Sequence, residues 1–195
     1  MAGREIVLCV GGGIAAYKAA ALTSILTQRG AGVTVAMTRN ARRFVGPITF
    51  EALSGRPVFL SQWRAGRSGD VQHLALSSRA DLIVLAPATA DLIGKLAGGL
   101  ADDHVSALLL GAACPILLAP AMNARMWAHP AVRRNVAFLR AHGFAQVGPD
   151  AGWQACRDIG PGRMSEPEAI VAAMVELLTR PASRDGRPAM SAPAR

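Results

Sequence analysis

Residues 152–167, GWQACRDIGPGRMSEP, are the stretch of this sequence whose residue types most directly suggest chemistry. Cys156 lies there among glycines, arginines and a proline, with no apolar run around it. One interpretation is a loop in which the cysteine is incidental. The other is a mobile flap that carries a reactive thiol to a bound substrate, because glycines permit hinge motion and a thiol can donate a proton.

A glycine-rich segment follows the first apolar run, residues 5–10. Gly11, Gly13 and Ala16 in VGGGIAAYK fit the spacing G-x-G-x-x-A. Glycines allow close backbone approach, and the N-terminus of a following helix favours a phosphate. The alternative is a tight strand–helix turn without a ligand.

The second apolar run, residues 32–37, ends at Thr38, Arg39 and Asn40. A NAD site would place Asp or Glu there to bind the ribose, so these residues disfavour NAD. They suit a phosphate held by a hydroxyl and backbone amides, either that of a mononucleotide or the extra phosphate of NADP.

Two later runs end in polar or small residues. Pro87, Ala88 and Thr89 form a turn that a flat ring could approach closely, and Asp102 and Asp103 beyond it are typical of a helix N-terminus. Asn123 offers both a donor and an acceptor, either to a ligand or as turn chemistry and an N-cap.

His73 is an isolated histidine, either structural or a base near neutral pH.

Apolar runs alternate with helical patterns along the chain, which indicates a parallel sheet covered on both faces. We predict a single α/β domain over residues 1–180, with a Rossmann-like doubly wound parallel sheet of about six strands. The predicted strands are 5–10, 32–37, 57–60, 80–88, 115–121 and 144–148, and the predicted helices include 14–30, 89–97, 101–110, 130–142 and a final helix capped by Ser165 with Glu168. Residues 181–195, rich in Pro, Ala, Ser and Arg, are predicted to be a disordered tail. Ligands bind beyond the carboxyl ends of the strands in such sheets.

Composition narrows the class of protein. The chain has 195 residues, of which 51% are hydrophobic and 17% charged, as in a compact domain. We find no membrane-spanning run and no signal peptide, and we expect a cytoplasmic protein without a membrane partner. Three cysteines argue against a disulfide framework, and four histidines without ligand spacing argue against a metal site. The net charge of +8 suits phosphorylated small molecules, whereas 5% aromatic residues and no basic helical stripe argue against nucleic acid.

Four ordered motifs together carry a resemblance to a known family. PAMNARMW matches the pattern P-x-M-N-x-x-M-W, and GGIAAYK, APATA…GKLAGGLADD and ACRDIGPGRMSEP agree with it. The chain resembles the homo-oligomeric flavin-containing cysteine decarboxylases over about residues 4–179. The resemblance implies FMN as the cofactor.

The resemblance also implies roles for individual residues. The residues that it places against the flavin or its phosphate are Gly12, Gly13, Ile14, Thr38, Pro87, Ala88 and Thr89. His73 corresponds to an active-site histidine, Asn123 to the residue that binds the substrate carboxylate, and Cys156 to the reactive thiol of a substrate-covering flap. The implied substrate-binding residues are Asn123, Met122, Ala155, Arg163 and Met164.

The implied reaction is decarboxylation of 4′-phosphopantothenoylcysteine to 4′-phosphopantetheine in coenzyme A biosynthesis. Transient oxidation of the substrate thiol to a thioaldehyde supplies the electron sink that CO2 loss needs, and FMN takes and returns the electron pair. The implied partners are copies of the same chain, as a trimer or dodecamer with flavin sites between subunits, and a ligase domain that acts in trans. The alternatives are oxidative decarboxylation of a peptide C-terminal cysteine to an ene-thiol, a non-catalytic flavoprotein, and an NADP-binding reductase.

Three positions depart from the family pattern. Gly11 stands where Thr or Ser is usual, Asp91 where Asn is common, and Arg157 where glycine is expected after the flap cysteine.

Overall fold

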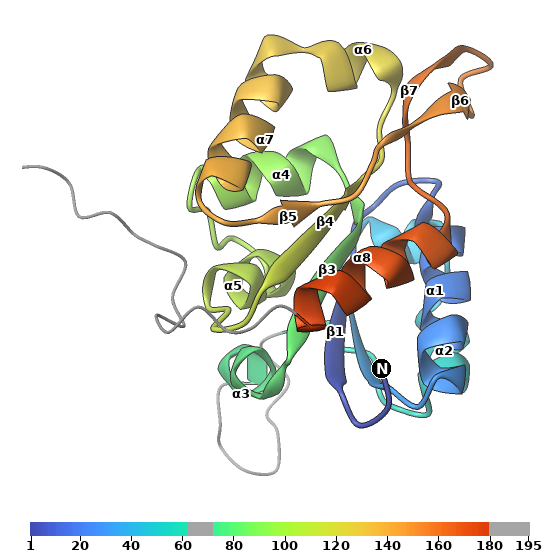
Figure 1. Ribbon diagram of the computed structural model, residues 1–195, viewed down its shortest axis with the longest axis vertical. Coiled ribbons are helices and arrows are strands. Elements are labelled where there is room, and N and C mark those ends of the chain that lie inside the picture. Colours follow the sequence, from blue (N-terminus) through green and yellow to red (C-terminus); the bar gives the residue numbers. More distant parts are fainter. Residues whose placement is uncertain (62–71, 180–195) are drawn as a thin grey trace, which may run out of the picture.

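Five parallel strands form the central sheet of the protein, with helices on both faces (Figure 1). The structure is a computed structural model that describes residues 1–61 and 72–179, with the backbone alone for residues 72–75. The strands are β1 Glu5–Val10, β2 Gly32–Met37, β3 Leu82–Ala88, β4 Ile116–Pro120, β5 Ala145–Gln146, β6 Asp150–Trp153 and β7 Ile159–Arg163. The helices are α1 Ala16–Gln28, α2 Pro47–Ser54, α3 Gln72–Arg79, α4 Ala90–Ala97, α5 His104–Leu110, α6 Ala124–Ala128, α7 Pro130–Ala141 and α8 Pro167–Thr179, with a short 3-10 helix, η1, over Ala41–Arg43.

The strand order of the sheet is β2-β1-β3-β4-β5, and every pair is parallel. The predicted α/β class and parallel sheet are confirmed, and the sheet has five strands where about six were predicted. Residues 57–60 do not form a strand, because among them only Phe59 makes a bridge, to Ala36 at the end of β2. The pairing does not continue past this bridge, and Pro57 has no amide hydrogen to donate to a ladder.

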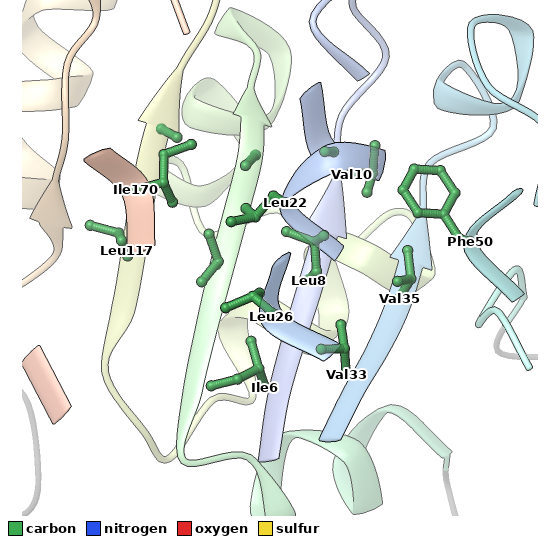
Figure 2. Close-up of a cluster of buried hydrophobic side chains, with 14 of the residues drawn as sticks. Ile6, Leu8, Val10, Leu22, Leu26, Val33, Val35, Phe50, Leu117 and Ile170 are labelled. Atoms are coloured by element: carbon green, nitrogen blue, oxygen red, sulfur yellow. The ribbon is translucent and has the colours of Figure 1, made fainter. Parts of the chain in front are cut away.

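Each face of the sheet has its own apolar core. On one face α1, α2 and α8 cover the strands, and Figure 2 shows Leu22 and Leu26 of α1, Phe50 of α2 and Ile170 of α8 packed over strand residues. On the other face α4, α5 and α7 bury Ile93, Leu108 and Leu139 among others. Strands apolar on both sides are what a sheet buried between two helical layers requires.

The direction in which successive strands are added to the sheet reverses between β1 and β3. From β1 the chain passes to β2 on one side, and from β3 it passes to β4 on the other. The loops that follow β1 and β3 therefore diverge, and a crevice opens at their carboxyl ends. Any cofactor of this fold is expected in that crevice.

A second, two-stranded sheet consists of β6 and β7, paired antiparallel (Figure 1). It extends beyond the carboxyl edge of the main sheet and contains most of the stretch that we predicted to be a flap. The stretch is therefore a β-hairpin, in which Trp153 pairs with Ile159.

The start of α8 differs from the predicted capping box. The helix begins at Pro167, and the Ser165 hydroxyl donates to Asp150 Oδ1 at 2.8 Å instead of capping it. Ser165 thus connects the start of β6 to the segment after β7. The predicted tail, residues 181–195, lies outside the described residues, and within the described part no helix combines the length and hydropathy needed to cross a bilayer.

Candidate active site

A cavity of about 890 Å³ opens at the carboxyl edge of the sheet, between the N-terminus of α1 and the β6–β7 hairpin. Its walls come from the loops after β1, β2, β3 and β4 and from the hairpin. The sequence-predicted site residues that line it are Gly12, Gly13, Ile14, Thr38, Thr89, Met122, Asn123, Ala155, Cys156, Arg163 and Met164. Segments that are far apart in the sequence therefore meet around one cavity.

Three predicted residues do not lie on the described wall of this cavity. Pro87 and Ala88 are buried beneath it, and the Ala88 carbonyl accepts from the amide of Ala121, which does line the cavity. His73 lies on α3, and its side chain is outside the described residues.

The loop after β1 packs too closely against its neighbours to accept side chains at two positions. A Cβ on Gly12 would collide with the Cβ of Asn40, and one on Gly11 would collide with the Pro87 carbonyl oxygen. Gly11, a departure from the family pattern, is therefore required by the packing in this chain. Ala15 precedes α1 without a side-chain cap, so the amides at this helix N-terminus suit an anionic group.

The loops after β2 and β3 each present a threonine to the cavity. The Thr38 hydroxyl oxygen accepts from the Ala41 amide at 3.1 Å, which leaves the hydroxyl proton free to donate to a ligand. Thr89 is the N-cap of α4, where its hydroxyl accepts from the Leu92 amide at 3.4 Å. Both residues thus combine a local structural bond with exposure to the cavity.

Asn123, after β4, is an N-cap, one of the two roles that its sequence context left open, and it also lines the cavity. Its Oδ1 accepts from the Arg125 amide at 2.8 Å and so caps α6. Because Oδ1 is used in this way, the Nδ2 group must face the other direction, where it donates to Cys156 Sγ at 3.0 Å. The cap fixes which end of the amide points toward the hairpin.

The tip of the hairpin holds Cys156 in an exposed position. The Gln154 amide donates to the Asp158 carbonyl, and the Arg157 amide donates to the Gln154 carbonyl, both at 2.9 Å. Arg157 has φ of 65°, the one positive φ outside glycine among the described residues. A glycine would adopt this conformation without strain, which accounts physically for the family's preference at this position.

Gln154 is a site residue that the sequence did not indicate. Only 7% of it is exposed, and its Oε1 accepts from the Ala124 amide at 3.1 Å while its Nε2 donates to the Pro161 carbonyl at 3.1 Å. Cys156 Sγ lies 3.5 Å from the same Oε1, within reach of a weak S–H donor bond. One buried amide therefore joins α6, β7 and the thiol.

The acidic cluster beside the cavity is structural. Lys95 Nζ lies 3.0 Å from Asp102 and 3.1 Å from Asp103, and 3.6 Å from Asp91. Burial lowers the pKa of Lys95, but its hydrogen bonds to Asp102 and Asp103 outweigh that effect and hold the pKa above its ordinary value. Asp103 accepts from the amides of Val105 and Ser106 and caps α5, which confirms its interpretation as a helix-terminal charge.

Lys18 is the second cavity residue that the sequence did not indicate. It lies in the first turn of α1, where lysine is normally exposed, yet only 6% of it is exposed. The Lys18 Nζ donates to the Met164 carbonyl at 2.9 Å and to Glu166 Oε1 at 2.7 Å. The helical pattern alone does not mark this position as buried.

The fold and the site define a class of protein. A doubly wound parallel sheet, with a glycine-rich loop and a helix N-terminus at one cavity, is typical of proteins that bind a nucleotide cofactor. The model of the Flavoprotein family matches residues 1–179, and the chain belongs to that family.

Curated relatives resemble this chain over part of their length. The coenzyme A biosynthesis bifunctional protein CoaBC of Bacillus subtilis is 49% identical over 168 residues, which are 86% of this chain and 41% of that protein. CoaBC of Mycolicibacterium smegmatis is 48% identical over 177 residues, 91% of this chain and 42% of that protein. The chain thus spans about two fifths of the length of these relatives.

Solved structures resemble it over nearly their whole length. A mutant PPC decarboxylase complexed with pantothenoylaminoethenethiol has a TM-score of 0.81 and 28% identity, with 89% of this chain and 97% of that chain covered. The FMN-dependent cysteine decarboxylase SpaF has a TM-score of 0.77 and 34% identity, with 90% and 98% covered.

Proposed function

We propose that this chain is an FMN-dependent decarboxylase that converts 4′-phosphopantothenoylcysteine to 4′-phosphopantetheine in coenzyme A biosynthesis. The observation that carries the proposal is the 3.0 Å contact between Asn123 Nδ2 and Cys156 Sγ at the cavity. It brings a donor for a carboxylate next to a source of protons. The CoaBC relatives at 48–49% identity and the PPC decarboxylase fold support the same function.

The cavity fits FMN in size and chemistry. Its volume is in the range of cofactor sites, and Gly12 and Gly13 of the first loop line it without side chains of their own. The N-terminus of α1 and the Thr38 hydroxyl are suited to hold a phosphate, and of the turn predicted to lie against the flavin, Thr89 lines the cavity. When bound, FMN supplies a two-electron acceptor and donor.

Asn123 binds and orients the substrate carboxylate in this proposal. Its amide is fixed by the α6 cap, so the Nδ2 donor is already aimed at the cavity and needs no reorganisation. The carboxylate takes the place of Cys156 Sγ as the acceptor of that bond. The substrate carboxylate is thereby held beside the thiol.

Cys156 supplies the proton that completes the product. CO2 loss from the thioaldehyde leaves an ene-thiolate, and conversion to the saturated product requires one proton in addition to the returned hydride. The thiol proton of Cys156 is directed at Gln154 Oε1, 3.5 Å from Sγ, and becomes available when the substrate enters. The hairpin covers the substrate and excludes water during this step.

The position of α3 supports a homo-oligomer. Figure 1 places α3 and the β6–β7 hairpin at opposite ends of the molecule, so we propose that His73 acts in the cavity of a neighbouring copy. The assembly that we propose is a trimer or a dodecamer of this chain. We also propose a cytoplasmic location. We further propose that the chain cooperates with a separate ligase domain, and the name of the CoaBC relatives as bifunctional proteins supports a second activity beside this one.

The test is to incubate the purified chain and FMN with 4′-phosphopantothenoylcysteine and, in parallel, with a peptide that ends in cysteine. We expect a loss of CO2 without net oxidation from the small thiol, measured by mass spectrometry. Conversion of the peptide alone to an ene-thiol would contradict the proposal and favour oxidative decarboxylation of a peptide C-terminal cysteine. A colourless protein that does not take up FMN would refute both.

A further inference from the structure

Lys18 connects the two halves of the candidate active site. It lies three residues after Ala15, in the helix that follows the glycine-rich loop, and its Nζ bonds the Met164 carbonyl and Glu166. Met164 and Glu166 come directly after β7, at the base of the hairpin. One buried side chain therefore joins the loop of the proposed cofactor site to the segment that carries Cys156.

Burial and pairing of the Lys18 amino group strengthen the connection between α1 and the base of the hairpin. A buried amino group is costly unless it is paired, and Lys18 is paired with a full carboxylate and a carbonyl. Glu166 also accepts from Arg163 of β7 at 3.1 Å, so the carboxylate joins α1 to β7. The hydrogen bond from Lys18, together with the positive charges of Lys18 and Arg163, lowers the pKa of Glu166, which keeps this carboxylate charged at neutral pH.

The hairpin has two further attachments, both to the segment after β4. The Met122 amide donates to the Gly162 carbonyl at 2.9 Å, and the Ala124 amide donates to Gln154 Oε1. These bonds hold one side of the hairpin, and Lys18 holds its base from the other side. The position of Cys156 relative to Asn123 is the sum of these constraints.

We propose that Lys18 is a positioning residue that latches the base of the β6–β7 hairpin to α1 and thereby holds the Cys156 thiol in register with Asn123. The latch itself does not depend on the identity of the substrate. Its effect on turnover rests on the proposed function.

Lys18→Met is the informative variant. Methionine retains the aliphatic stem in the buried site, and the Glu166 side chain, 55% exposed and still paired with Arg163, is not stranded as a buried charge. Glu166→Gln is the second variant, because it keeps an acceptor for Lys18 without the charge. Arg56→Met is the matched control, since it removes an ion pair to Glu5 at 2.6 Å near the amino ends of the strands, away from the hairpin.

Hydrogen exchange of the full chain with FMN tests the latch without any substrate. We expect Lys18→Met to accelerate exchange in residues 150–164 by about tenfold, with a smaller increase in Glu166→Gln and none in Arg56→Met, while β1 and β3 keep their protection. Unchanged exchange in 150–164, or an equal acceleration across the whole chain, would overturn the proposal.

Turnover gives the second measurement. With 4′-phosphopantothenoylcysteine, Lys18→Met is expected to release a several-fold larger share of ene-thiol, because the thiol no longer meets the decarboxylated substrate, with KM changed less than about twofold. A lower rate with an unchanged product ratio would show a merely structural role. If the wild-type chain has no activity, the proposed function fails, and the exchange result still decides the latch.

Discussion

Asn123 combines a helix cap with the donor that we propose for the substrate carboxylate. Helix capping and ligand binding were alternatives at this position in the sequence, yet the two ends of the amide make separate bonds, one to Arg125 and one to Cys156. The cap removes the ambiguity in amide orientation that an isolated asparagine would have. The structural bond is therefore what aims the functional one.

Cys156→Ser tests the proton source. A serine hydroxyl is a much weaker acid than a thiol, so CO2 release is expected to continue while formation of the saturated product falls by about a hundredfold. Mass spectrometry of the products would show accumulated ene-thiol.

The control for this variant is Cys114→Ser. Cys114 is half-buried and remote from the cavity wall, and burial raises its pKa to about 11. We expect no change in its product ratio. The same ratio of products in Cys156→Ser as in the wild type would remove Cys156 from the reaction.

Lys18 and Gln154 illustrate what the sequence does not reveal about single residues. Lysine on an amphipathic helix is exposed by default, and glutamine in a glycine-rich stretch has no distinguishing pattern. Their burial follows from contacts with Met164, Glu166 and Ala124, which lie far away in the sequence. The helical or strand periodicity of the sequence around a residue does not predict contacts with partners so distant in the chain.

At the scale of elements, the loop after β1 offers a matched pair of variants. We expect Gly12→Ala to destabilise the fold by about 1–3 kcal/mol, because the new methyl group meets Asn40 in a packed turn. In Gly13→Ala the new Cβ lies 3.7 Å from Thr89 Cγ2, an ordinary contact, so stability without FMN should be retained.

Urea unfolding and FMN titration of both variants separate packing from ligand contact. A loss of FMN affinity in Gly13→Ala at unchanged stability supports contact between this loop and the cofactor. Equal stability losses in the two variants would contradict the packing argument.

The Asp103 cap of α5 gives a dependence of stability on pH. Burial raises the pKa of Asp103, but hydrogen bonds from the amides of Ser106 and Val105 and from Lys95 outweigh it, so the folded pKa lies below its ordinary value of 3.8. Its contribution is therefore complete above pH 4 and is lost as pH falls through the folded pKa. We expect Asp103→Ala to cost about 1 kcal/mol at pH 7 and less at pH 3.

Urea unfolding at pH 3, 5 and 7 measures this difference. Asp103→Asn is the control, because asparagine keeps the cap without the charge and should cost less at pH 7. A penalty for Asp103→Ala that is the same at all three pH values would mean that its charge contributes nothing.

Elements with strong end signals were predicted well from the sequence. Helices at 90–97 and 130–141 agree with the predicted helices 89–97 and 130–142, and the second has Pro130 in its first turn and Gly143 after its last, where such residues act locally. The run 57–60 and the Ser165 cap were wrong, since strand pairing and the Ser165–Asp150 bond depend on distant partners. Helix α2 was not predicted although Pro47 and Gly55 mark its ends.

At the scale of the whole molecule, the shared cavity of the proposed oligomer can be tested by complementation. His73→Asn and Cys156→Ser should each lack normal turnover to 4′-phosphopantetheine. If each cavity takes His73 from one copy and Cys156 from another, random mixing restores about a quarter of the sites.

Co-expression of the two variants and measurement of 4′-phosphopantetheine formation provide the readout. Activity near a quarter of the wild-type level supports sites between copies. No recovery in mixed oligomers, verified by two different affinity tags, would mean that both residues act within one chain.

Gln154 has a consequence for how the molecule moves. Because its single amide bonds α6 and β7 and lies against the thiol, the tip of the hairpin cannot lift gradually without losing several bonds together. We expect these bonds of Gln154 to break together, so that the tip of the hairpin opens in one cooperative event. Under the proposed function, in which the hairpin covers the substrate, we expect its opening to be a discrete step whose rate can limit turnover.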